Sequence, residues 1–400
     1  MSRSIVVFCM GGVGHVKVLA PLIAGLGKRG CTVRVMTRLE FRGEIEAAGG
    51  TFVDLYAGRP LEAVDATSLP LPCRFVTYAA AYAPAVASEI SAWAPELIAY
   101  DTYTVIAPVV ARLLGVPYVN VCPNHAPVPS RTIAALREDP RVAISEECWA
   151  AVDRLEREYG FADASPFFYV QALSPFLNLY CEPPEFLRAE DRAEFEPLEV
   201  LSSLPEPPPA RARSRRSRRR NLYASFGTGV WRYFDRAALG ALTVVARSVA
   251  ETEADLLISL GGHALPAAAH DELASANVRI AGYVDQHAVL AEADLLLTHH
   301  GLNSTHESIF HEVPMLSYPF FGDQPALARR CQDLGLALPL TDSPREAIDP
   351  DRFKAALARV EDEREAFASR LAEARAWECR TIANRGAVVD RVLELIAARP

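Results

Sequence analysis

Lysine is scarce in this sequence, and long apolar runs are missing from it. Only three of the 400 residues are lysine and the net charge is −9, which does not favour nucleic acid as a partner. No run of about twenty apolar residues occurs, so we expect no stable insertion in a membrane. The first apolar run, Ile5–Met10, is too short for the core of a signal peptide.

Paired cysteine motifs are also missing. The eight cysteines are scattered, no C-x-x-C pair occurs, and several cysteines fall in predicted core strands. This pattern predicts reduced thiols in a cytoplasmic protein. The length predicts two or three domains, each large enough for its own core. We expect a monomer or a homodimer.

The segment 295–310 has the layout of an anion-binding site. Leu295–Thr298 is too apolar to show an alternating pattern, as expected for a parallel strand covered on both faces. After a short polar turn, Asn303 or Ser304 is predicted to be the N-cap of a helix. The amides at a helix start and the helix dipole suit a phosphate group. The side chains of His299 and Ser304 can donate further hydrogen bonds.

Two more turns are predicted at the same edge of the sheet. A second strand, 313–319, is followed by Asp323 and Gln324, and ligands of open α/β sheets bind at the carboxyl ends of the strands. A third strand, 222–224, is followed by a turn that we expect to meet the phosphates. That turn contains Ser225, Gly227 and Thr228.

These residues resemble the nucleotide-sugar signature of the UDP-glycosyltransferase superfamily, whose members are inverting, metal-independent enzymes. The matching pattern is His299-x-Gly301-x-Asn303-Ser304-x-x-Glu307, then Pro314, then Asp323-Gln324. The resemblance implies the GT-B fold, an α/β architecture in which two Rossmann-like doubly wound domains face each other across a cleft.

The resemblance also implies a role for each residue of the pattern. His299 and Ser304 would contact the diphosphate, and Glu307 would bind the ribose hydroxyls. Asp323 and Gln324 would contact the sugar hydroxyls. This last pair favours UDP-glucose as the co-substrate, with a dTDP-deoxysugar as the second candidate.

An upstream segment is similar to the family's Trp-x-Pro-Gln motif, which stacks on the base. It reads Tyr283-Val284-Asp285-Gln286, so tyrosine replaces tryptophan and aspartate replaces proline. The resemblance implies base stacking by Tyr283 and donor contacts by Val284 and Gln286.

Four histidines within thirteen residues could suggest a zinc site. His300, His306 and His311 lie close to His299 in the sequence, but no cysteine or carboxylate spacing of a known zinc site accompanies them. We expect these three to be pocket-wall or surface residues.

A second feature could suggest a metal. Asp349-Pro350-Asp351 looks like the Asp-x-Asp cluster of metal-dependent GT-A enzymes, but it lies directly before the helical segment 352–360. There it is expected to cap the helix. We therefore expect no metal and no cofactor, with the nucleotide sugar as a co-substrate.

A glycine-rich turn follows the apolar strand 5–8. Gly11, Gly12 and Gly14 lead directly to His15 and a helical pattern. The third glycine of a dinucleotide fingerprint is missing, and so is the Gly-Lys-Ser/Thr of a P-loop. The turn instead presents a histidine, a side chain suited to general-base catalysis near neutral pH.

A partner for His15 is available in Asp101. The segment 96–100 is predicted to be a strand, and the ends of parallel strands meet at one edge of the sheet. In the family named above, a Gly-His after the first strand and an Asp after a later strand form the catalytic dyad. The resemblance implies that His15 deprotonates an acceptor hydroxyl while Asp101 stabilises the imidazolium. In-line displacement of the nucleoside diphosphate would give a β-glycoside from an α-linked donor.

The acceptor is expected to be a hydrophobic, hydroxylated small molecule, such as a polyketide or phenolic natural product. In the GT-B architecture the amino-terminal domain binds the acceptor, although aromatic residues at these spacings also occur in protein cores. The candidate pocket residues are Phe75, Tyr78, Asn124, His125, Trp149 and Phe168.

Four segments are predicted along the chain. Residues 1–205 form the acceptor-binding domain, and residues 221–375 form the nucleotide-sugar-binding domain. Between them, 206–220 is rich in proline and arginine, with seven arginines in 211–220. Proline followed by like charge predicts an exposed linker, although a tail for nucleic acid or anionic membrane is the alternative. The helix predicted in 376–400 either crosses back to the first domain or packs on its own domain.

Two other classes of function are left open. A catalytically silent GT-B homologue could act as a partner of another enzyme, although the presence of His15, Asp101 and Glu307 argues against this. A GT-B sugar-nucleotide epimerase would consume the nucleotide sugar without an acceptor, so a donor-only assay would distinguish it.

Overall fold

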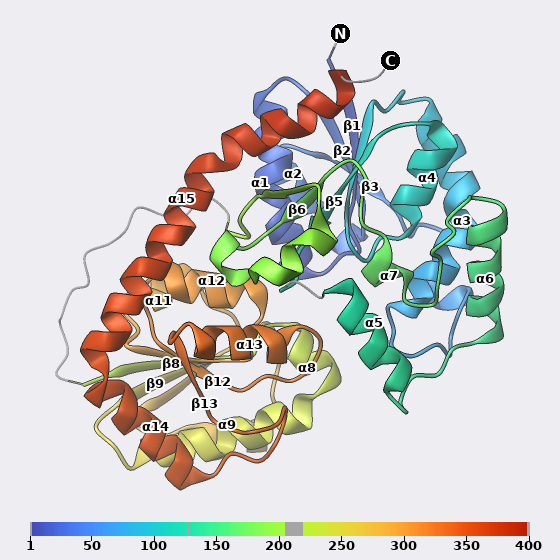
Figure 1. Cartoon of the computed structure of the whole chain (residues 1–400). Coiled ribbons are helices and arrows are strands. Elements are labelled where there is room, and N and C mark those ends of the chain that lie inside the picture. Colours follow the sequence, from blue (N-terminus) through green and yellow to red (C-terminus); the bar gives the residue numbers. More distant parts are fainter. Residues whose placement is uncertain (1, 126–127, 205–218, 398–400) are drawn as a thin grey trace. The chain divides into compact units, whose positions relative to one another are not determined.

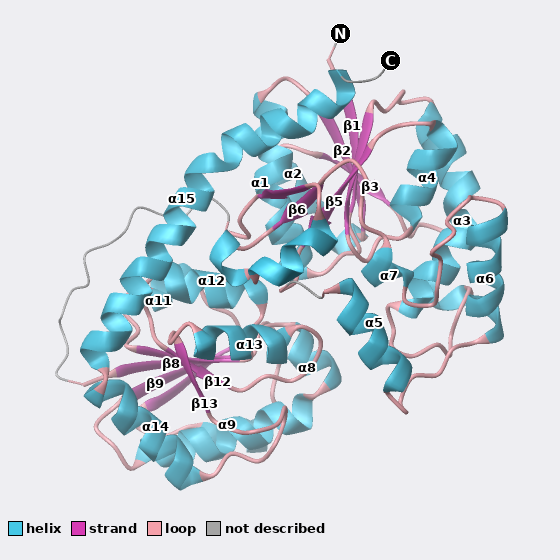
Figure 2. Cartoon of the chain, viewed as in Figure 1, coloured by secondary structure: helices cyan, strands magenta, loops and turns pink. Residues whose placement is uncertain are grey.

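The computed structural model describes residues 2–125, 128–204 and 219–397, which form two compact α/β units (Figure 1). Unit 1 comprises residues 1–205 and 381–400, and unit 2 comprises residues 206–380. Each unit is built on one parallel sheet with helices packed beside it (Figure 2). Among the described residues, no helix is long and apolar enough to cross a membrane.

Unit 1 contains a seven-stranded sheet in the order β3-β2-β1-β4-β5-β6-β7, and all neighbouring strands are parallel. Its strands are β1 (Ser4–Phe8), β2 (Thr32–Thr37), β3 (Thr51–Asp54), β4 (Leu97–Asp101), β5 (Tyr118–Cys122), β6 (Asn178–Tyr180) and β7 (Leu198–Val200). Its α-helices are α1 (Val13–Lys28), α2 (Arg42–Ala47), α3 (Cys73–Ser91), α4 (Ile106–Leu114), α5 (Pro129–Glu138), α6 (Glu146–Arg157) and α7 (Phe168–Gln171). The strand order reverses at β1, so the residues after β1 and β4 lie at a topological switch point, where such sheets bind ligands.

Unit 2 contains a six-stranded parallel sheet in the order β10-β9-β8-β11-β12-β13. Its strands are β8 (Asn221–Ser225), β9 (Asp255–Ser259), β10 (Val278–Ala281), β11 (Leu295–Thr298), β12 (Met315–Ser317) and β13 (Ala337–Pro339). Its helices are α8 (Gly229–Tyr233), α9 (Asp235–Ala250), α10 (Ala267–Leu273), α11 (Gln286–Leu290), α12 (Leu302–Phe310), α13 (Gln324–Asp333) and α14 (Pro350–Asp362), followed by α15 (Arg364–Ala397). The switch point here lies between β8 and β11.

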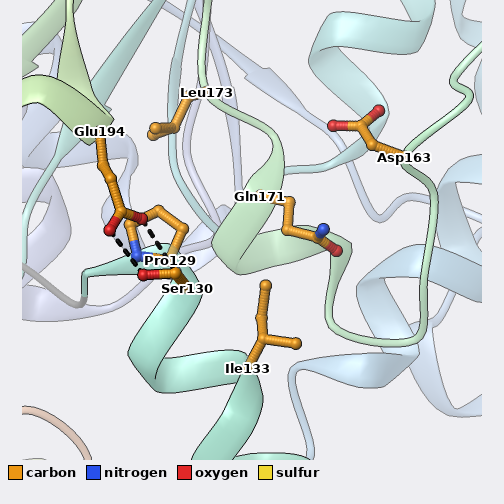
Figure 3. A pocket seen from close by; sticks show the side chains of 7 residues that line it. All are labelled: Pro129, Ser130, Ile133, Asp163, Gln171, Leu173 and Glu194. Atoms are coloured by element: carbon orange, nitrogen blue, oxygen red, sulfur yellow. Dashed lines mark hydrogen bonds between the residues drawn. The ribbon is translucent and has the colours of Figure 1, made fainter.

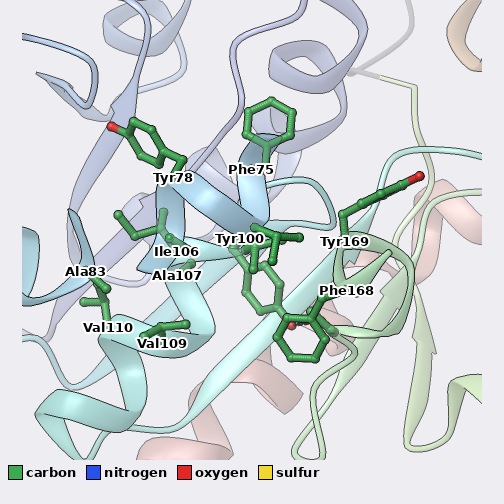
Figure 4. Packing of buried hydrophobic residues seen from close by; sticks show 14 of the residues in the cluster. Phe75, Tyr78, Ala83, Tyr100, Ile106, Ala107, Val109, Val110, Phe168 and Tyr169 are labelled. Carbon is green, nitrogen blue, oxygen red and sulfur yellow. Dashed lines mark hydrogen bonds between the residues drawn. The ribbon is translucent and has the colours of Figure 1, made fainter. Parts of the chain in front are cut away.

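One hydrophobic core cluster of unit 1 lies between the sheet and helices α3, α4, α6 and α7 (Figure 4). Alternate residues of a strand face the same side, so Val6 and Phe8 of β1 pack with Ile98 and Tyr100 of β4 on that side. The Tyr100 hydroxyl donates a hydrogen bond to the carbonyl of Ala172, which satisfies its polar atom inside the core.

The last helix contributes residues to both units. The helix predicted in 376–400 is the end of a longer helix, α15. The division between the units falls after Arg380 rather than after residue 375. From Thr381 onward α15 belongs to unit 1. There Arg29 of α1 pairs with Asp390 and donates a hydrogen bond to the carbonyl of Gly386 at 2.6 Å.

The predicted linker lies mostly outside the described residues, because only Arg219 and Arg220 of it are described. The guanidinium of Arg220 lies 2.9 Å from the Glu361 carboxylate of α14. This end of the arginine run therefore pairs with acidic side chains of unit 2.

Candidate active site

His15 and Asp101 lie together at the carboxyl edge of the unit 1 sheet. His15 is the third residue of α1 and Asp101 is the last residue of β4. Nδ1 of His15 is 3.6 Å from Oδ2 of Asp101, which is longer than a hydrogen bond but close enough for electrostatic attraction. Asp101 is fully buried and the His15 side chain is 15% exposed, so the imidazole is the member that a substrate can reach.

Two backbone amides hold the Asp101 carboxylate in place. The amide of Met10, just after β1, donates to Oδ2 at 2.6 Å, and the amide of Tyr103 donates to Oδ1 at 2.9 Å. Such bonds to an ionised group are among the stronger ones in proteins. Burial, and then the charge of Asp101, raises the pKa of the Cys9 thiol, so this neighbour stays neutral.

Aromatic side chains connect His15 to the rest of unit 1. The Tyr103 ring lies 5.4 Å from the His15 ring and stacks on Tyr169 of α7 at 5.8 Å. The side-chain amide of Asn124, after β5, donates a hydrogen bond to the Tyr103 hydroxyl at 2.7 Å. Tyr103 therefore ties the imidazole to two further segments of unit 1.

In unit 2, Gln286 joins the predicted donor residues into one hydrogen-bonded chain. The Tyr223 hydroxyl donates to Oε1 of Gln286 at 3.0 Å, and Nε2 of Gln286 donates to Glu307 at 2.6 Å and to Ser304 at 3.1 Å. Burial raises the pKa of Tyr223 to about 12, so its hydroxyl remains a donor. Asp285 caps α11 by accepting from the Ala288 amide, which positions Gln286 at the helix start.

His299 is packed between two glycines. It follows β11, and a Cβ atom built at Gly227 would lie 2.8 Å from its Cε1 and Nε2 atoms. A Cβ built at Gly301 would lie equally close to Cε1. Burial lowers the pKa of His299 to about 4, so the imidazole is neutral at neutral pH. It can still donate a hydrogen bond to a phosphate oxygen.

The buried His299 should make the folded state sensitive to acid. Its pKa is about 4 when folded and 6.5 without burial, so between these values the unfolded chain binds more protons. The contribution of the neutral His299 to the free energy of unfolding is complete above pH 6.5 and is lost as the pH falls through 4. Urea unfolding at pH 7 and at pH 5 measures how far the free energy of unfolding falls between the two pH values. In His299→Gln this fall should be about 2 kcal/mol smaller than in the wild type. His270→Gln, at an exposed site on α10, is the control, and an unchanged pH dependence in His299→Gln would contradict the burial effect.

The helix that follows His299 starts earlier than predicted. Gly301 is the N-cap of α12, with an extended backbone and no side-chain cap, so the N-cap prediction for Asn303 or Ser304 is wrong. Both residues lie in the first turn of the helix, where backbone amides have no partner within the helix. Since His299 fills the space beside Gly301, this cap position accepts no side chain. The helix start still presents its amides to an anion.

The remaining predicted donor residues lie at or near the carboxyl edge of the same sheet. Gln324 is buried, and its Oε1 atom accepts hydrogen bonds from the amides of Phe320 and Phe321, which orients its carboxamide. Asp323 is the N-cap residue of α13. Ser225 is buried at the end of β8, Gly227 has a positive φ, and Thr228 is exposed. Val284 is half-buried, and Tyr283 is 66% exposed, as a residue that stacks on a ligand requires.

The three neighbouring histidines were expected at the surface or in a pocket wall, and for two of them this prediction is wrong. His300 is fully buried and lies 2.8 Å from the Ser317 hydroxyl. His306 is also fully buried, and its Nδ1 atom pairs with the buried Glu378 carboxylate of α15. His311 is half-buried at the end of α12, where it contacts His287 at 3.1 Å.

The Asp-x-Asp segment is a helix start, as predicted. Asp349 is the N-cap of α14, and its carboxylate accepts a hydrogen bond from the Asp351 amide at 3.0 Å. Across the described ranges, no three histidine, cysteine or acidic side chains gather in a way that could hold a metal ion.

Most of the predicted acceptor-pocket aromatics belong to the core. Phe75, Tyr78 and Phe168 are buried in the unit 1 cluster (Figure 4), because α3 and α7 turn these side chains toward the sheet. Trp149 of α6 is 55% exposed. The pocket prediction is therefore wrong for Phe75, Tyr78 and Phe168, and for the exposed Trp149 it stays a prediction. Asn124 and His125, in contrast, lie at the carboxyl edge of the sheet, after β5.

Unit 1 contains an open pocket that the sequence did not indicate. It has a volume of about 300 Å³ and lies beside the start of α5 and the end of α7 (Figure 3). Within it, the Ser130 hydroxyl and amide donate hydrogen bonds to the Glu194 carboxylate at 2.5 and 2.9 Å. The residues that line this pocket have no regular spacing in the sequence that would identify them as a site. They are Pro129, Ser130, Ile133, Asp163, Gln171, Leu173 and Glu194.

Comparison with known proteins gives consistent similarities. Residues 243–382 match the family model of the erythromycin biosynthesis protein CIII-like C-terminal domain. A zeaxanthin glucosyltransferase of Pseudescherichia vulneris is 34% identical over 131 residues, which span 33% of this chain and 30% of that relative. The NDP-glycosyltransferase YjiC of Bacillus licheniformis is 22% identical over 387 residues, or 90% of this chain and 92% of that relative. The crystal structure of the kitacinnamycin glycotransferase shares the fold, with a TM-score of 0.78, 20% identity, and coverage of 99% and 100% of the two chains.

Proposed function

We propose that this chain, which belongs to the UDP-glycosyltransferase superfamily and has its GT-B fold, transfers a hexose with inversion and without a metal ion. The donor would be a nucleoside diphosphate sugar, with UDP-glucose favoured, and the acceptor a hydroxyl group of a hydrophobic natural product. Similarity to a glucosyltransferase of zeaxanthin, a hydroxylated hydrophobic molecule, supports glucose and this acceptor class.

The observation that carries the proposal is the arrangement of His15 in front of the buried Asp101. Asp101 faces Nδ1, so Nε2 is the nitrogen that would take the acceptor proton. As the acceptor oxygen forms its bond to the anomeric carbon, the bond from that carbon to the diphosphate oxygen breaks. The bonding electrons leave with the diphosphate, the proton moves to His15, and Asp101 stabilises the resulting imidazolium.

Unit 2 supplies the groups that would hold the leaving diphosphate. The first-turn amides of α12 and the neutral His299 can donate hydrogen bonds as negative charge develops on it. Glu307, oriented by Gln286, would accept hydrogen bonds from the ribose hydroxyls. Asp323 and Gln324 would contact the hexose. All of these groups belong to unit 2.

Mass spectrometry of transfer reactions tests the proposal. UDP-glucose is incubated with the chain, EDTA and a panel of hydrophobic phenols and alcohols, and we expect one acceptor or more to gain the mass of one hexose. A parallel reaction without acceptor should leave UDP-glucose intact. Consumption of the donor alone would instead indicate an epimerase or hydrolase. Absence of product with UDP-glucose and with dTDP-sugars would contradict a transferase function.

A further inference from the structure

A second histidine–carboxylate pair lies at the same sheet edge as His15 and Asp101. His125 follows β5 and Glu182 follows β6, and the strands β1, β4, β5 and β6 are successive neighbours in the unit 1 sheet. Because parallel strands end at one edge, the two pairs share the edge where this fold binds ligands.

The two pairs are alike in burial, although the distance between the imidazole and the carboxylate is 3.6 Å in the first pair and 2.8 Å in the second. Nδ1 of His125 lies 2.8 Å from Oε1 of Glu182, and the two side chains are 10% and 0% exposed. The corresponding values for His15 and Asp101 are 15% and 0%. In each pair a fully buried carboxylate supports an imidazole that is itself still accessible.

The surroundings of Glu182 determine which nitrogen of His125 can act. The Tyr180 hydroxyl donates to the same oxygen, Oε1, so this buried carboxylate accepts from two donors. With Nδ1 donating to the carboxylate, Nε2 becomes the nitrogen that accepts a hydrogen bond. A buried pair of this kind carries a large desolvation cost, so stability alone is a weak reason for it.

The segment that carries His125 also contacts the surroundings of the His15–Asp101 pair. Its neighbour Asn124 donates a hydrogen bond to the Tyr103 hydroxyl. Tyr103 packs against the His15 ring, and its backbone amide donates to Asp101. A molecule bound next to His15 would therefore lie close to the loop after β5.

We propose that His125, positioned by Glu182, accepts a hydrogen bond from a second hydroxyl group of the acceptor. His15 would take the proton from the first hydroxyl, the one that is glycosylated. This inference rests on the proposed function and narrows its acceptor class to molecules with two or more hydroxyl groups. His125 would then determine acceptor specificity without taking part in the chemical step.

The test compares 7-hydroxy-4-methylcoumarin with its 5,7-, 6,7- and 7,8-dihydroxy counterparts. We expect the wild type to prefer one dihydroxy compound. In His125→Ala, the KM for that compound should rise about tenfold, while its kcat and the KM for the monohydroxy compound should change by less than about twofold. His125→Gln, which keeps a hydrogen-bond acceptor, should recover part of the preference, and Glu182→Gln should weaken it. Leu113→Ala, at an exposed site near the end of α4, is the control.

The ratio of the two KM values is internal to each variant, so partial misfolding does not affect it. Equal loss toward both acceptors in His125→Ala would overturn the inference, and so would a wild type with no preference for any dihydroxy compound. Fluorescence titration of the coumarins without donor gives a second readout. If no glycoside forms but the wild type binds a dihydroxy coumarin more tightly and His125→Ala loses that difference, the proposed function is wrong and the binding inference stands.

Discussion

Replacing His15 with alanine should lower kcat for glycosyl transfer by about 10²- to 10⁴-fold, the usual contribution of a general base. The affinity for UDP should stay nearly unchanged, because in the proposed mechanism the imidazole acts on the acceptor proton in the transition state and unit 2 binds the nucleotide. The kcat is measured with the best acceptor and UDP-glucose, and the UDP affinity by calorimetry.

The control for this variant is His270→Ala, which removes a half-exposed histidine from α10 and should leave both quantities at their wild-type values. Asp101→Asn should also lower kcat, since it removes the charge that stabilises the imidazolium. Wild-type turnover in His15→Ala would show that another group takes the proton, and the dyad assignment would be wrong.

Replacing Glu307 with alanine should weaken UDP binding strongly. Hydrogen bonds to a charged group contribute about 1.5–3 kcal/mol, so the Kd for UDP should rise roughly 10- to 150-fold. The loss also leaves Nε2 of Gln286 without its closest partner, Oε2 of Glu307 at 2.6 Å. Calorimetric titration with UDP measures the effect directly, and kcat at saturating donor should fall less than kcat/KM.

Glu292→Ala is the matched control, because Glu292 is an exposed glutamate just before β11 in the same unit. Its Kd for UDP should equal that of the wild type. An unchanged Kd in Glu307→Ala would remove Glu307 from the ribose site and leave its buried contact with Gln286 as a structural one.

The sheets could be predicted well from the sequence. The predicted strand Leu295–Thr298 coincides with β11, and the predicted strand 5–8 differs from β1 by one residue at one end. The predicted strand 96–100 differs from β4 by one residue at each end. A parallel strand that is covered on both faces needs a short, uninterrupted run of apolar residues. Such runs can be recognised in the sequence. The turns after these strands could be assigned to one edge for the same reason.

The local details of the donor site could not be predicted in the same way. Asn303 and Ser304 are good N-cap residues, yet the helix begins after Gly301, because the His299 ring occupies the space that a side chain at that position would need. The burial of His300 depends on Ser317, a residue distant in the sequence. A local sequence pattern does not reveal contacts between residues that are distant in the sequence.

The acceptor side was the least predictable part. Tyr78 and Phe168 are aromatic residues near a predicted ligand edge, but the same residue types fill cores, and the fold places them there. The pocket beside α5 is lined in part by Ser130 and Glu194, which come from distant segments of the chain. The pairing of His125 with Glu182 could be recognised only in the folded structure.

The anomeric configuration of the product tests the central claim most directly. A glycoside made with UDP-glucose, whose glucose is α-linked, is purified and its anomeric proton is examined by NMR. A single displacement assisted by His15 predicts the β-anomer, recognised by the large coupling between the two axial protons at C1 and C2. An α-glycoside would show retention of configuration and would contradict direct attack by the acceptor that His15 deprotonates.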